Sequence, residues 1–442
     1  MIVEHLSLVD FRNYAAADVE LGPGPNVFVG RNGQGKTNLA EAIGFFATLG
    51  SHRVSNDAPM VRDGADAAII RARLAHGERR VQLEAQVNRQ GSNKARVNGS
   101  PVKPAELPRY AQVVLFAPED LQIVRGDPSA RRRFADQLLV QRAPRMAGVI
   151  ADYDRVLKQR TALLKSARAR GIRGDALSTL DVWDDKLVSL GTQLIAARLA
   201  LASDLATPLA ASYTAIAGAD HNPEIEWALS VAGADTGEDG EGTGSAAGSG
   251  TPGAERTTDA STARIADLFR GALAAKRSSE LERGLTLVGP HRDDLLLRIR
   301  GLPVKGYASH GESWSVALSL RLASAQLLRA DSRLGDPVLI LDDVFAELDT
   351  DRRARLATLA GDYEQVVVTA AVEGDVPEGL RARMVRVEAG RILPAPADTD
   401  PGAHPDLGSD PGSAPDSGSH PDPGSDRDAG AGPETMAEST DA

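Results

Sequence analysis

The sequence predicts an α/β fold in which an α-helical lobe is inserted between two halves of a head that contains a mixed sheet. Three observations lead to this prediction. A glycine-rich loop at residues 30–37 lies between a short aliphatic strand and a helical stretch. A second aliphatic strand at residues 338–341 ends on two aspartates. Between these two segments lies a long stretch of helical pattern that is dense in arginine.

The loop at residues 30–37 reads G-x-x-x-x-G-K-T, the pattern of a P-loop that wraps nucleotide phosphates. Its glycines let backbone N–H groups face the phosphates, and the following helix N-terminus adds positive potential. Lys36 is placed to reach the β- and γ-phosphates, and Thr37 to offer its hydroxyl to Mg²⁺. We therefore predict an ATP and Mg²⁺ site formed by Gly30, Arg31, Asn32, Gly33, Gln34, Gly35, Lys36 and Thr37.

Composition narrows the possible classes of protein. The chain has 442 residues and no cysteine, which excludes disulfides, zinc knuckles and thiol catalysis. The N-terminus has no basic leader or long apolar run, and the apolar stretch 194–212 is broken by Arg198 and Asp204, so we predict a cytoplasmic protein without a membrane span. The net charge is −11, but residues 395–442 carry −10 and residues 232–262 carry −5, which leaves +4 on the rest. The acidic pI therefore does not exclude nucleic acid as a partner.

The head begins with two short strands in residues 2–29, and their turn carries Arg12 and Asn13. These two side chains are either nucleotide contacts or parts of an ordinary polar turn. Residues 67–102 alternate in polarity and include a turn at 88–91 and an Asn-Gly turn at 98–99, which predicts an antiparallel meander. Arg71 and Arg73 lie on it as candidate nucleic-acid contacts, although a charged sheet face is more often simply solvated.

The helical lobe follows a short buried strand at residues 113–116. It opens with Arg131, Arg132 and Arg133, three further candidate nucleic-acid contacts, and its apolar residues recur at helical spacing. A glycine break at 171–174 predicts an antiparallel pair of helices. Residues 232–262 read as a disordered insertion, helix resumes at about 263–281, and the tail 394–442 reads as disordered and acidic.

The second half of the predicted site lies near the C-terminus. The strand at 338–341 delivers Asp342, the expected Mg²⁺ carboxylate, and Asp343, which could orient or deprotonate the attacking water. A later strand at 366–368 ends on Thr369. Ser309 and Gly311 begin an amphipathic helix, so they form either an anion-binding helix end or an ordinary N-cap.

Taken in order, the P-loop, Ser-His-Gly-Glu at 309–312, Leu-Asp-Asp at 341–343 and Glu-Leu-Asp at 347–349 resemble the Walker A, signature, Walker B and D-loop of ABC-type ATPases. The insertion between Walker A and signature is similar to that of the SMC-like branch. The motifs at 11–14, 118–121, 289–294 and 341–345 resemble those of the RecF family, over residues 1–393. Two departures are Glu312, where ABC signatures often carry Gln, and the lack of an obvious Q-loop glutamine after Phe116.

The resemblance implies an ABC-type head at 1–128 and 283–393, a helical lobe at 129–282, and catalytic roles for Lys36, Asp342, Asp343, Ser309 and Gly311. Two heads would close on ATP, so that the P-loop of one subunit faces the signature of the other. RecF-like proteins bind duplex or gapped DNA and junctions with ATP, and they show weak DNA-stimulated ATPase activity. They work with RecR and RecO, promote RecA loading at gaps and support the SOS response.

Residue content adds an expectation about the DNA surface. Aromatic residues make up only 4% of the chain, which is poor material for stacking single-stranded bases. Arginine contacts to phosphate instead predict sequence-independent duplex binding with a steep salt dependence. Two rival functions remain: the ATPase subunit of a transporter, which shares the nucleotide motifs, and a metabolic P-loop kinase, for which the 309–312 helix start would be accidental.

Overall fold

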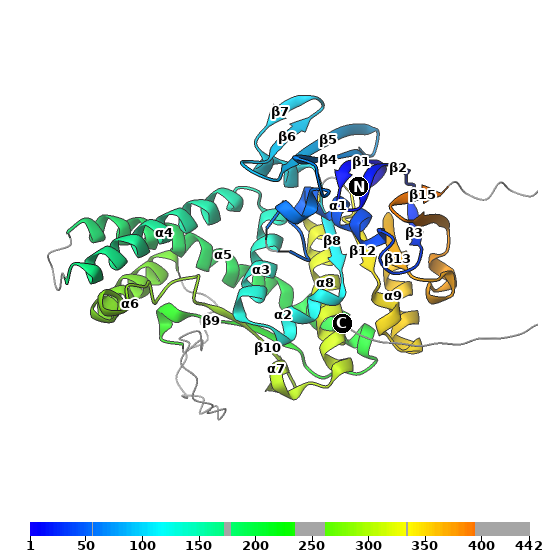
Figure 1. The fold of residues 1–442 in the computed structure, drawn as a ribbon. Coiled ribbons are helices and arrows are strands. Elements are labelled where there is room, and N and C mark those ends of the chain that lie inside the picture. Colours follow the sequence, from blue (N-terminus) through cyan, green and yellow to red (C-terminus); the bar gives the residue numbers. More distant parts are fainter. Residues whose placement is uncertain (55, 172–177, 235–260, 333–334, 394–442) are drawn as a thin grey trace, which may run out of the picture. The chain divides into compact units, whose positions relative to one another are not determined.

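The computed structural model describes residues 1–54, 56–171, 178–234, 261–332 and 335–393 (Figure 1). Met1–Ala395 form one compact unit. The predicted acidic tail and nearly all of the predicted insertion at 232–262 lie outside the described residues. The edges of that insertion do not: Ala232 ends a short 3-10 turn and Thr262 begins a helix.

The first sheet is antiparallel, in the order β2-β1-β4-β5-β6-β7. Its members are β1 (Ile2–Phe11), β2 (Tyr14–Glu20), β4 (Ala67–His76), β5 (Arg79–Asn88), β6 (Lys94–Val97) and β7 (Ser100–Val102). The predicted meander is confirmed. At the tight turn between β6 and β7, Asn98 and Gly99 both have positive φ (50° and 79°), which explains why this dipeptide is favoured there.

The second sheet is mostly parallel, in the order β15-β14-β3-β13-β12-β8, and only β15 runs antiparallel to its neighbour. Its members are β3 (Gly24–Val29), β8 (Val113–Phe116), β12 (Val338–Asp342), β13 (Gln365–Ala370), β14 (Arg383–Glu388) and β15 (Arg391–Leu393). Residues from distant parts of the sequence therefore become neighbours. The P-loop strand β3 pairs with β13, and β13 pairs with the aspartate strand β12.

Strands β8, β12 and β13 are buried at every residue, which is why they are mostly aliphatic. Along β12, Ile340 faces one hydrophobic cluster, together with helix α1 (Lys36–Thr48) and the antiparallel sheet. Leu339 and Leu341 face the other cluster, together with α8 (His310–Asp331) and the helical lobe. The helix after the P-loop is thus held between two sheets, and the signature helix lies on the opposite face of the parallel sheet.

The helical lobe contains α3 (Pro128–Arg142), α4 (Met146–Ala169), α5 (Ser178–Ala217) and α6 (Thr262–Arg283). The predicted apolar stripe is confirmed: Phe134, Leu138, Tyr153 and Leu164 are buried, and Leu157 is half-buried against the same core. Helix α5 packs against α4, α6 and α8. By length and composition alone α5 could cross a membrane, but this is weak evidence, since Leu194, Leu201 and Tyr213 lie in the protein core.

A small third sheet, in the order β11-β10-β9, was not expected from the sequence. It comprises β9 (Glu224–Ala228), β10 (Asp294–Ile299) and β11 (Leu302–Pro303), and leads through α7 (Val304–Tyr307) into α8. The remaining short elements are η1 (Ala58–Met60), η2 (Pro104–Arg109), η3 (Pro118–Asp120), α2 (Leu121–Arg125), η5 (Ser230–Ala232), η6 (Val344–Glu347), α9 (Thr350–Gly361), η7 (Glu373–Asp375) and η8 (Glu378–Leu380).

Candidate nucleotide site

The P-loop connects β3 to α1, as predicted, and Lys36 is the first residue of the helix. Gly33 and Gly35 have positive φ (82° and 120°), a conformation that side chains with a Cβ rarely adopt. A Cβ on Gly30 would lie 2.2 Å from the carbonyl oxygen of Val387, so the neighbouring strand leaves no room for one. These three glycines are therefore required by the shape of the loop.

Lys36 is 3% exposed, and its ammonium group points back across the loop. Its Nζ donates to the carbonyl oxygen of Arg31 (3.3 Å) and to Oδ1 of Asn32 (3.4 Å). Both contacts are long, so they hold the ammonium weakly. The Lys36 ammonium at the centre of the loop can therefore give up its contacts with Arg31 and Asn32 and bind phosphate oxygens in their place.

Arg12 and Asn13 lie beside the loop, but both already have protein partners. Arg12 donates to both carboxylate oxygens of Glu41, on the inner face of α1. Asn13 donates to the carbonyl oxygen of Gln34 (2.9 Å) and accepts from Asn38 (2.8 Å). Asn13 thus supports the loop from behind. A direct contact of either side chain with nucleotide stays a prediction.

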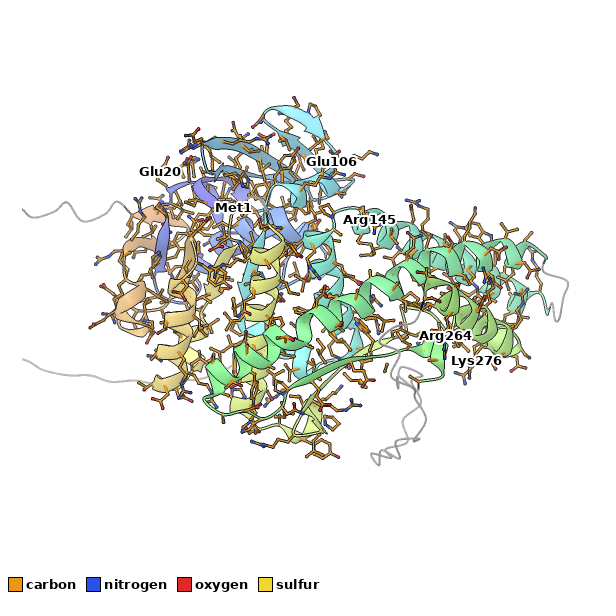
Figure 2. All side chains as sticks on the ribbon, turned by 180° about the vertical axis from the view of Figure 1, so that it is seen from behind. Met1, Glu20, Glu106, Arg145, Arg264 and Lys276 are labelled. Atoms are coloured by element: carbon orange, nitrogen blue, oxygen red, sulfur yellow. The ribbon has the colours of Figure 1, made fainter. Side chains whose placement is uncertain are left out.

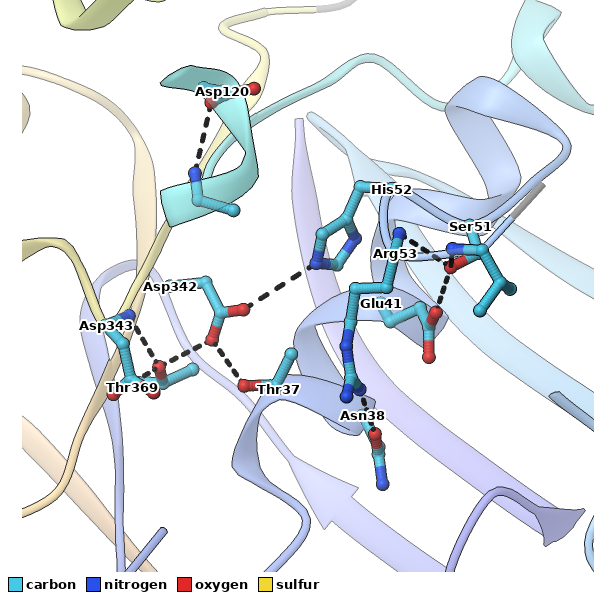
Figure 3. Close-up of polar contacts among 12 residues, drawn as sticks. Thr37, Asn38, Glu41, Ser51, His52, Arg53, Asp120, Asp342, Asp343 and Thr369 are labelled. Carbon is cyan, nitrogen blue, oxygen red and sulfur yellow. Dashed lines mark hydrogen bonds and ion pairs between the residues drawn. The ribbon is translucent and has the colours of Figure 1, made fainter. Parts of the chain in front are cut away.

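Asp342 lies at the centre of the polar residues below the loop, as Figure 3 shows. It is 2% exposed, and its Oδ1 accepts hydrogen bonds from Thr37 (3.0 Å) and Thr369 (2.6 Å). The two predicted Mg²⁺ ligands, Thr37 and Asp342, are therefore adjacent. Thr369, which the sequence marked only as a polar residue at a strand tip, is the third member of this group.

Asp343 follows immediately and has a positive φ of 51°. This left-handed conformation turns the chain away from β12 and starts η6. The Asp343 backbone N–H donates to Oγ1 of Thr369 (2.9 Å), so Thr369 orients both aspartates. Burial raises the pKa of Asp343, and the nearby Asp342 adds to this, although Lys36 opposes it. A carboxylate with a raised pKa beside the phosphate loop is suited to accept a proton from water.

The oxygen atoms of Thr37 and Asp342 suit the Mg²⁺ ion that is expected at this site. Among the residues that the structure describes, no group of three or more His, Cys, Asp or Glu side chains could hold a metal alone. Mg²⁺ in nucleotide sites commonly takes only one or two protein oxygens and completes its shell with phosphates and water. The hydroxyl of Thr37 and the carboxylate of Asp342 supply that kind of oxygen pair.

Sequence reasoning missed several residues of the loop that follows α1. His52 Nε2 lies 3.7 Å from Oδ2 of Asp342, the carboxylate oxygen that the threonines do not use. Arg53 Nη1 donates to Oδ1 of Asn38 in the first turn of α1 (2.9 Å). Both face the site in Figure 3. A single histidine and a single arginine in an irregular loop carry no periodicity or spacing that could have identified them.

Ser309 and Gly311 stand at the start of α8. Ser309 is the N-cap: its hydroxyl accepts from the backbone N–H of Glu312 (3.3 Å), while the Glu312 carboxylate accepts from the backbone N–H of Ser309 (2.9 Å). This reciprocal pair is a capping box. Glu312 also pairs with Arg300 at 2.9 Å. The unusual glutamate thus caps its own helix, and its charge is offset by a neighbouring arginine.

The structure does not bring all predicted catalytic residues into one place. Lys36, Thr37, Asp342 and Asp343 form one cluster around the P-loop. The signature helix begins just after α7, well away from α1 in Figure 1. Within the described part of the chain, the hydrogen bonds of Ser309 are made to its own helix. Within one chain, the P-loop cluster and the start of α8 are therefore separate from each other.

The arginines proposed for nucleic acid differ in their surroundings. On the antiparallel sheet, Arg71 pairs with Glu84, and Arg73 pairs with Glu4 and Glu20, so the positive charge of these two arginines is largely compensated by glutamates.

In the lobe, the Arg131 side chain is 5% exposed, and its guanidinium donates to both carboxylate oxygens of Asp294. Arg132 donates to the backbone oxygen of Asp293 and is partly buried. Arg133 is exposed. Of this set, Arg131 is part of the core of the fold.

The sequence of this chain is similar to a known protein family and to named members of it. Residues 2–391 match the family described as RecF/RecN/SMC N terminal domain. The DNA replication and repair protein RecF of Clavibacter michiganensis subsp. michiganensis (strain NCPPB 382) is 59% identical over 416 residues, covering 92% of this chain and 98% of that protein. RecF of Leifsonia xyli subsp. xyli (strain CTCB07) is 57% identical over 400 residues, covering 89% and 99%.

Solved structures agree with these relatives. The structure described as the recombination mediator protein RecF-ATPrS in the RecFOR pathway superposes with a TM-score of 0.75 at 25% identity, covering 88% of this chain and 97% of that chain. The predicted fold class, a P-loop ABC-type head with a helical lobe, is confirmed. The transporter alternative has no support among these matches.

Proposed function

This chain belongs to the RecF family, and from that premise we propose that it is an ATP-dependent DNA-binding protein of replication and recombinational repair. The observation that carries the proposal is the adjacency of Thr37, Asp342 and Thr369 beneath a fully formed P-loop. Relatives that are named DNA replication and repair protein RecF support the biological role.

The proposed reaction is slow hydrolysis of ATP. Backbone N–H groups of residues 30–37 and Lys36 would bind the phosphates, while Thr37 and Asp342 would hold Mg²⁺, which supplies positive charge that offsets that of the phosphates. Asp343 orients the attacking water and accepts its proton, since its raised pKa favours that transfer. Thr369 keeps both aspartates in place. ATP as the nucleotide is supported by the RecF-ATPrS structure to which this chain is similar.

The second half of the site would come from another copy of the chain. Ser309, which is exposed, and Gly311, which is half-buried, lie at a capped helix start away from the P-loop of their own chain. The N-terminal end of α8 carries positive potential that suits a γ-phosphate. ATP bound between two heads would then bridge the dimer, and hydrolysis would release it.

The proposed DNA surface lies mainly on the helical lobe. Exposed cations occur at Arg133 on α3, at Lys158 and Lys165 on α4, and at Arg145 and Arg170, the residues that flank α4. Figure 2 shows Arg145 at the start of α4, with Arg264 and Lys276 on the neighbouring α6. Phosphate contacts from such residues give binding without sequence readout. RecR- and RecO-like mediators, and RecA indirectly, are the proposed partners, in line with a RecF structure placed in the RecFOR pathway.

The test measures ATP hydrolysis and DNA binding together, with duplex, gapped and single-stranded DNA, for the wild type and Lys36→Ala. We expect binding to duplex or gapped DNA that requires ATP and Lys36, and hydrolysis that such DNA stimulates. If ATP turned over equally with and without DNA, the ATPase head would stand and the DNA-clamp function would be refuted. An ATP-dependent dimer also separates this function from that of a monomeric kinase.

A further inference from the structure

Arg352, in the first turn of α9, lies directly against the start of the signature helix. A Cβ placed on Gly311 would lie 3.0 Å from Nη1, 3.3 Å from Nη2 and 3.4 Å from Cζ of Arg352, so the guanidinium covers the glycine. The absence of a side chain at residue 311 is what permits this approach. Arg352 is therefore in contact with a residue of the signature turn, by which we mean residues 309–312 at the start of α8, although 41 positions separate Arg352 from Gly311 in the sequence.

Asp349 holds the Arg352 side chain in this position. The Asp349 carboxylate caps α9 by accepting from the backbone N–H of Arg352 (2.9 Å), and it also accepts from Nη1 of the same residue. The Nε of Arg352 is buried and has no hydrogen-bond partner among the residues that the structure describes. Arg353, which anchors α9, has a buried Nε without a partner in the described part of the chain as well, so the feature that distinguishes Arg352 is its contact with Gly311.

The neighbouring arginines of α9 have a different role. Arg353 donates to the carbonyl oxygen of Phe345 (2.8 Å), and Arg355 donates to that of Ile216 (3.2 Å). These two bonds fasten α9 to the preceding loop and to the end of α5. Only Arg352 of the three reaches the signature turn, and its side chain is 26% exposed there. The fold thus already has anchors for α9 that do not use Arg352.

From these contacts we infer that Arg352 is a positioning residue for the signature turn, and that it acts on the nucleotide held by the other subunit of the dimer. This inference rests on the proposed ATP-dependent dimer. The guanidinium packs against Gly311, which restricts movement of the turn, and it adds positive charge beside the N-terminus of α8, of which Asp349 offsets a part. Both effects favour binding of a γ-phosphate presented by the P-loop of another copy.

The inference predicts which subunit needs Arg352. Lys36→Ala removes the phosphate lysine from a subunit but leaves its signature turn intact. Arg352→Ala leaves the P-loop intact but disturbs the signature turn. In a mixed dimer of the two variants, one of the two composite sites combines an intact P-loop with an intact signature turn. A mixture of two inactive variants should therefore regain ATPase activity.

The experiment measures nucleotide binding, ATP-dependent dimerisation and ATPase rate for each variant alone and for the mixture. We expect Arg352→Ala to bind ATP within about twofold of wild type as a monomer and to lose at least about tenfold in ATPase rate, the scale for removing one preorganised donor. Arg352→Lys should recover part of the rate, because it restores the charge without the planar fork. Arg79→Ala, at an exposed arginine of β5, is the matched control and should behave as wild type.

Several results would overturn the inference. Full ATPase activity of Arg352→Ala alone would show that the contact with Gly311 has no role. Loss of ATP binding by the Arg352→Ala monomer would show that the residue supports its own P-loop instead. A mixture that stays inactive, with both variants folded, would exclude action across the dimer. A wild-type protein that remained monomeric with ATP would refute the proposed dimer itself, and the inference with it.

Discussion

Thr37 Oγ1 donates a 3.0 Å hydrogen bond to Oδ1 of Asp342, although 305 positions separate the two residues in sequence. The contact exists because β3 and β12 are both neighbours of β13 in the parallel sheet. The carboxyl ends of parallel strands meet at one sheet edge, so the P-loop and the two aspartates converge there. Thr369 occupies the same edge at the end of β13 and bonds to both aspartates.

Replacing Thr369 with valine tests this edge. The valine side chain has nearly the same shape but lacks the hydroxyl that donates to Asp342 and accepts from the backbone of Asp343. We expect ATPase activity to fall about tenfold or more and stability to fall by about 1–3 kcal/mol, because two buried polar groups lose a partner. Steady-state ATPase assays and urea unfolding measure the two effects. Thr369→Ser keeps the hydroxyl and should stay close to wild type. A serine variant as damaged as the valine variant would show that the hydroxyl alone does not account for the role of Thr369.

Replacing Glu312 with glutamine tests the departure from the common signature. Glutamine can still close the capping box, but it loses the ion pair with Arg300. The pair is partly exposed, so we expect a stability loss below about 1 kcal/mol at neutral pH. The hydrogen bond from the Ser309 backbone N–H, with help from Arg300, lowers the pKa of Glu312 below its ordinary 4.5.

The stability difference between wild type and Glu312→Gln should depend on pH. With a lowered folded-state pKa, Glu312 contributes stability that is present above about pH 4.5 and is lost as the pH falls through the lower value. Thermal unfolding of wild type and Glu312→Gln between pH 3 and 7 should show the difference shrinking in acid. A difference that grew as the pH fell would contradict the role assigned to the carboxylate.

His291, in the Gly-Pro-His-Arg-Asp-Asp motif at 289–294, gives a second pH prediction. Burial lowers its pKa from 6.5 to about 3, so the folded protein keeps this imidazole neutral. Its Nδ1 lies 2.7 Å from the hydroxyl of Tyr153, and its Nε2 lies 3.2 Å from the carbonyl oxygen of Thr286. As the pH falls below about 6.5, the unfolded chain gains a proton at His291 that the folded state does not take up. Stability from this residue is therefore present above about 6.5 and is lost progressively toward pH 3.

The measurement compares urea unfolding of wild type and His291→Gln at several pH values from 7 to 4. The wild type should lose more stability on acidification than the variant. Asp293 also titrates in this range, since burial raises its pKa to about 6 and gives the opposite slope in both proteins. The comparison of the two proteins removes that shared contribution. Parallel curves would show that His291 does not contribute to the pH dependence.

Charge reversal on α4 tests the proposed DNA surface. We expect Lys158→Glu combined with Lys165→Glu to weaken duplex binding for all sequences equally. The slope of log affinity against log salt concentration should fall by about 2, one for each lost phosphate contact. Fluorescence anisotropy over a series of salt concentrations measures both. Arg80→Ala is the matched control, because Glu4 already neutralises this sheet arginine. If Arg80→Ala weakened duplex binding more than the double lysine variant did, the DNA would bind at the antiparallel sheet and the proposed surface on α4 would be wrong.

The sequence by itself determined the local parts of this protein. The P-loop, the aspartate strand, the meander and the amphipathic helices depend on short-range rules: glycine conformation, strand alternation and helical periodicity. These rules act within a few residues, so the pattern alone revealed them. Residues of single occurrence, such as His52 and Arg352, belong to no repeating pattern and could not be found in this way.

Only the tertiary structure decided which charges are partners. Arg131 and Arg133 lie two positions apart in one arginine run, yet one is buried against Asp294 and the other is exposed. Arg352 reaches Gly311, and Thr369 reaches Asp342, only because the sheet and its helices bring distant segments together. An ion pair or a hydrogen bond depends on distances of a few ångströms between side chains, and sequence spacing does not contain those distances once the chain crosses from one strand to another.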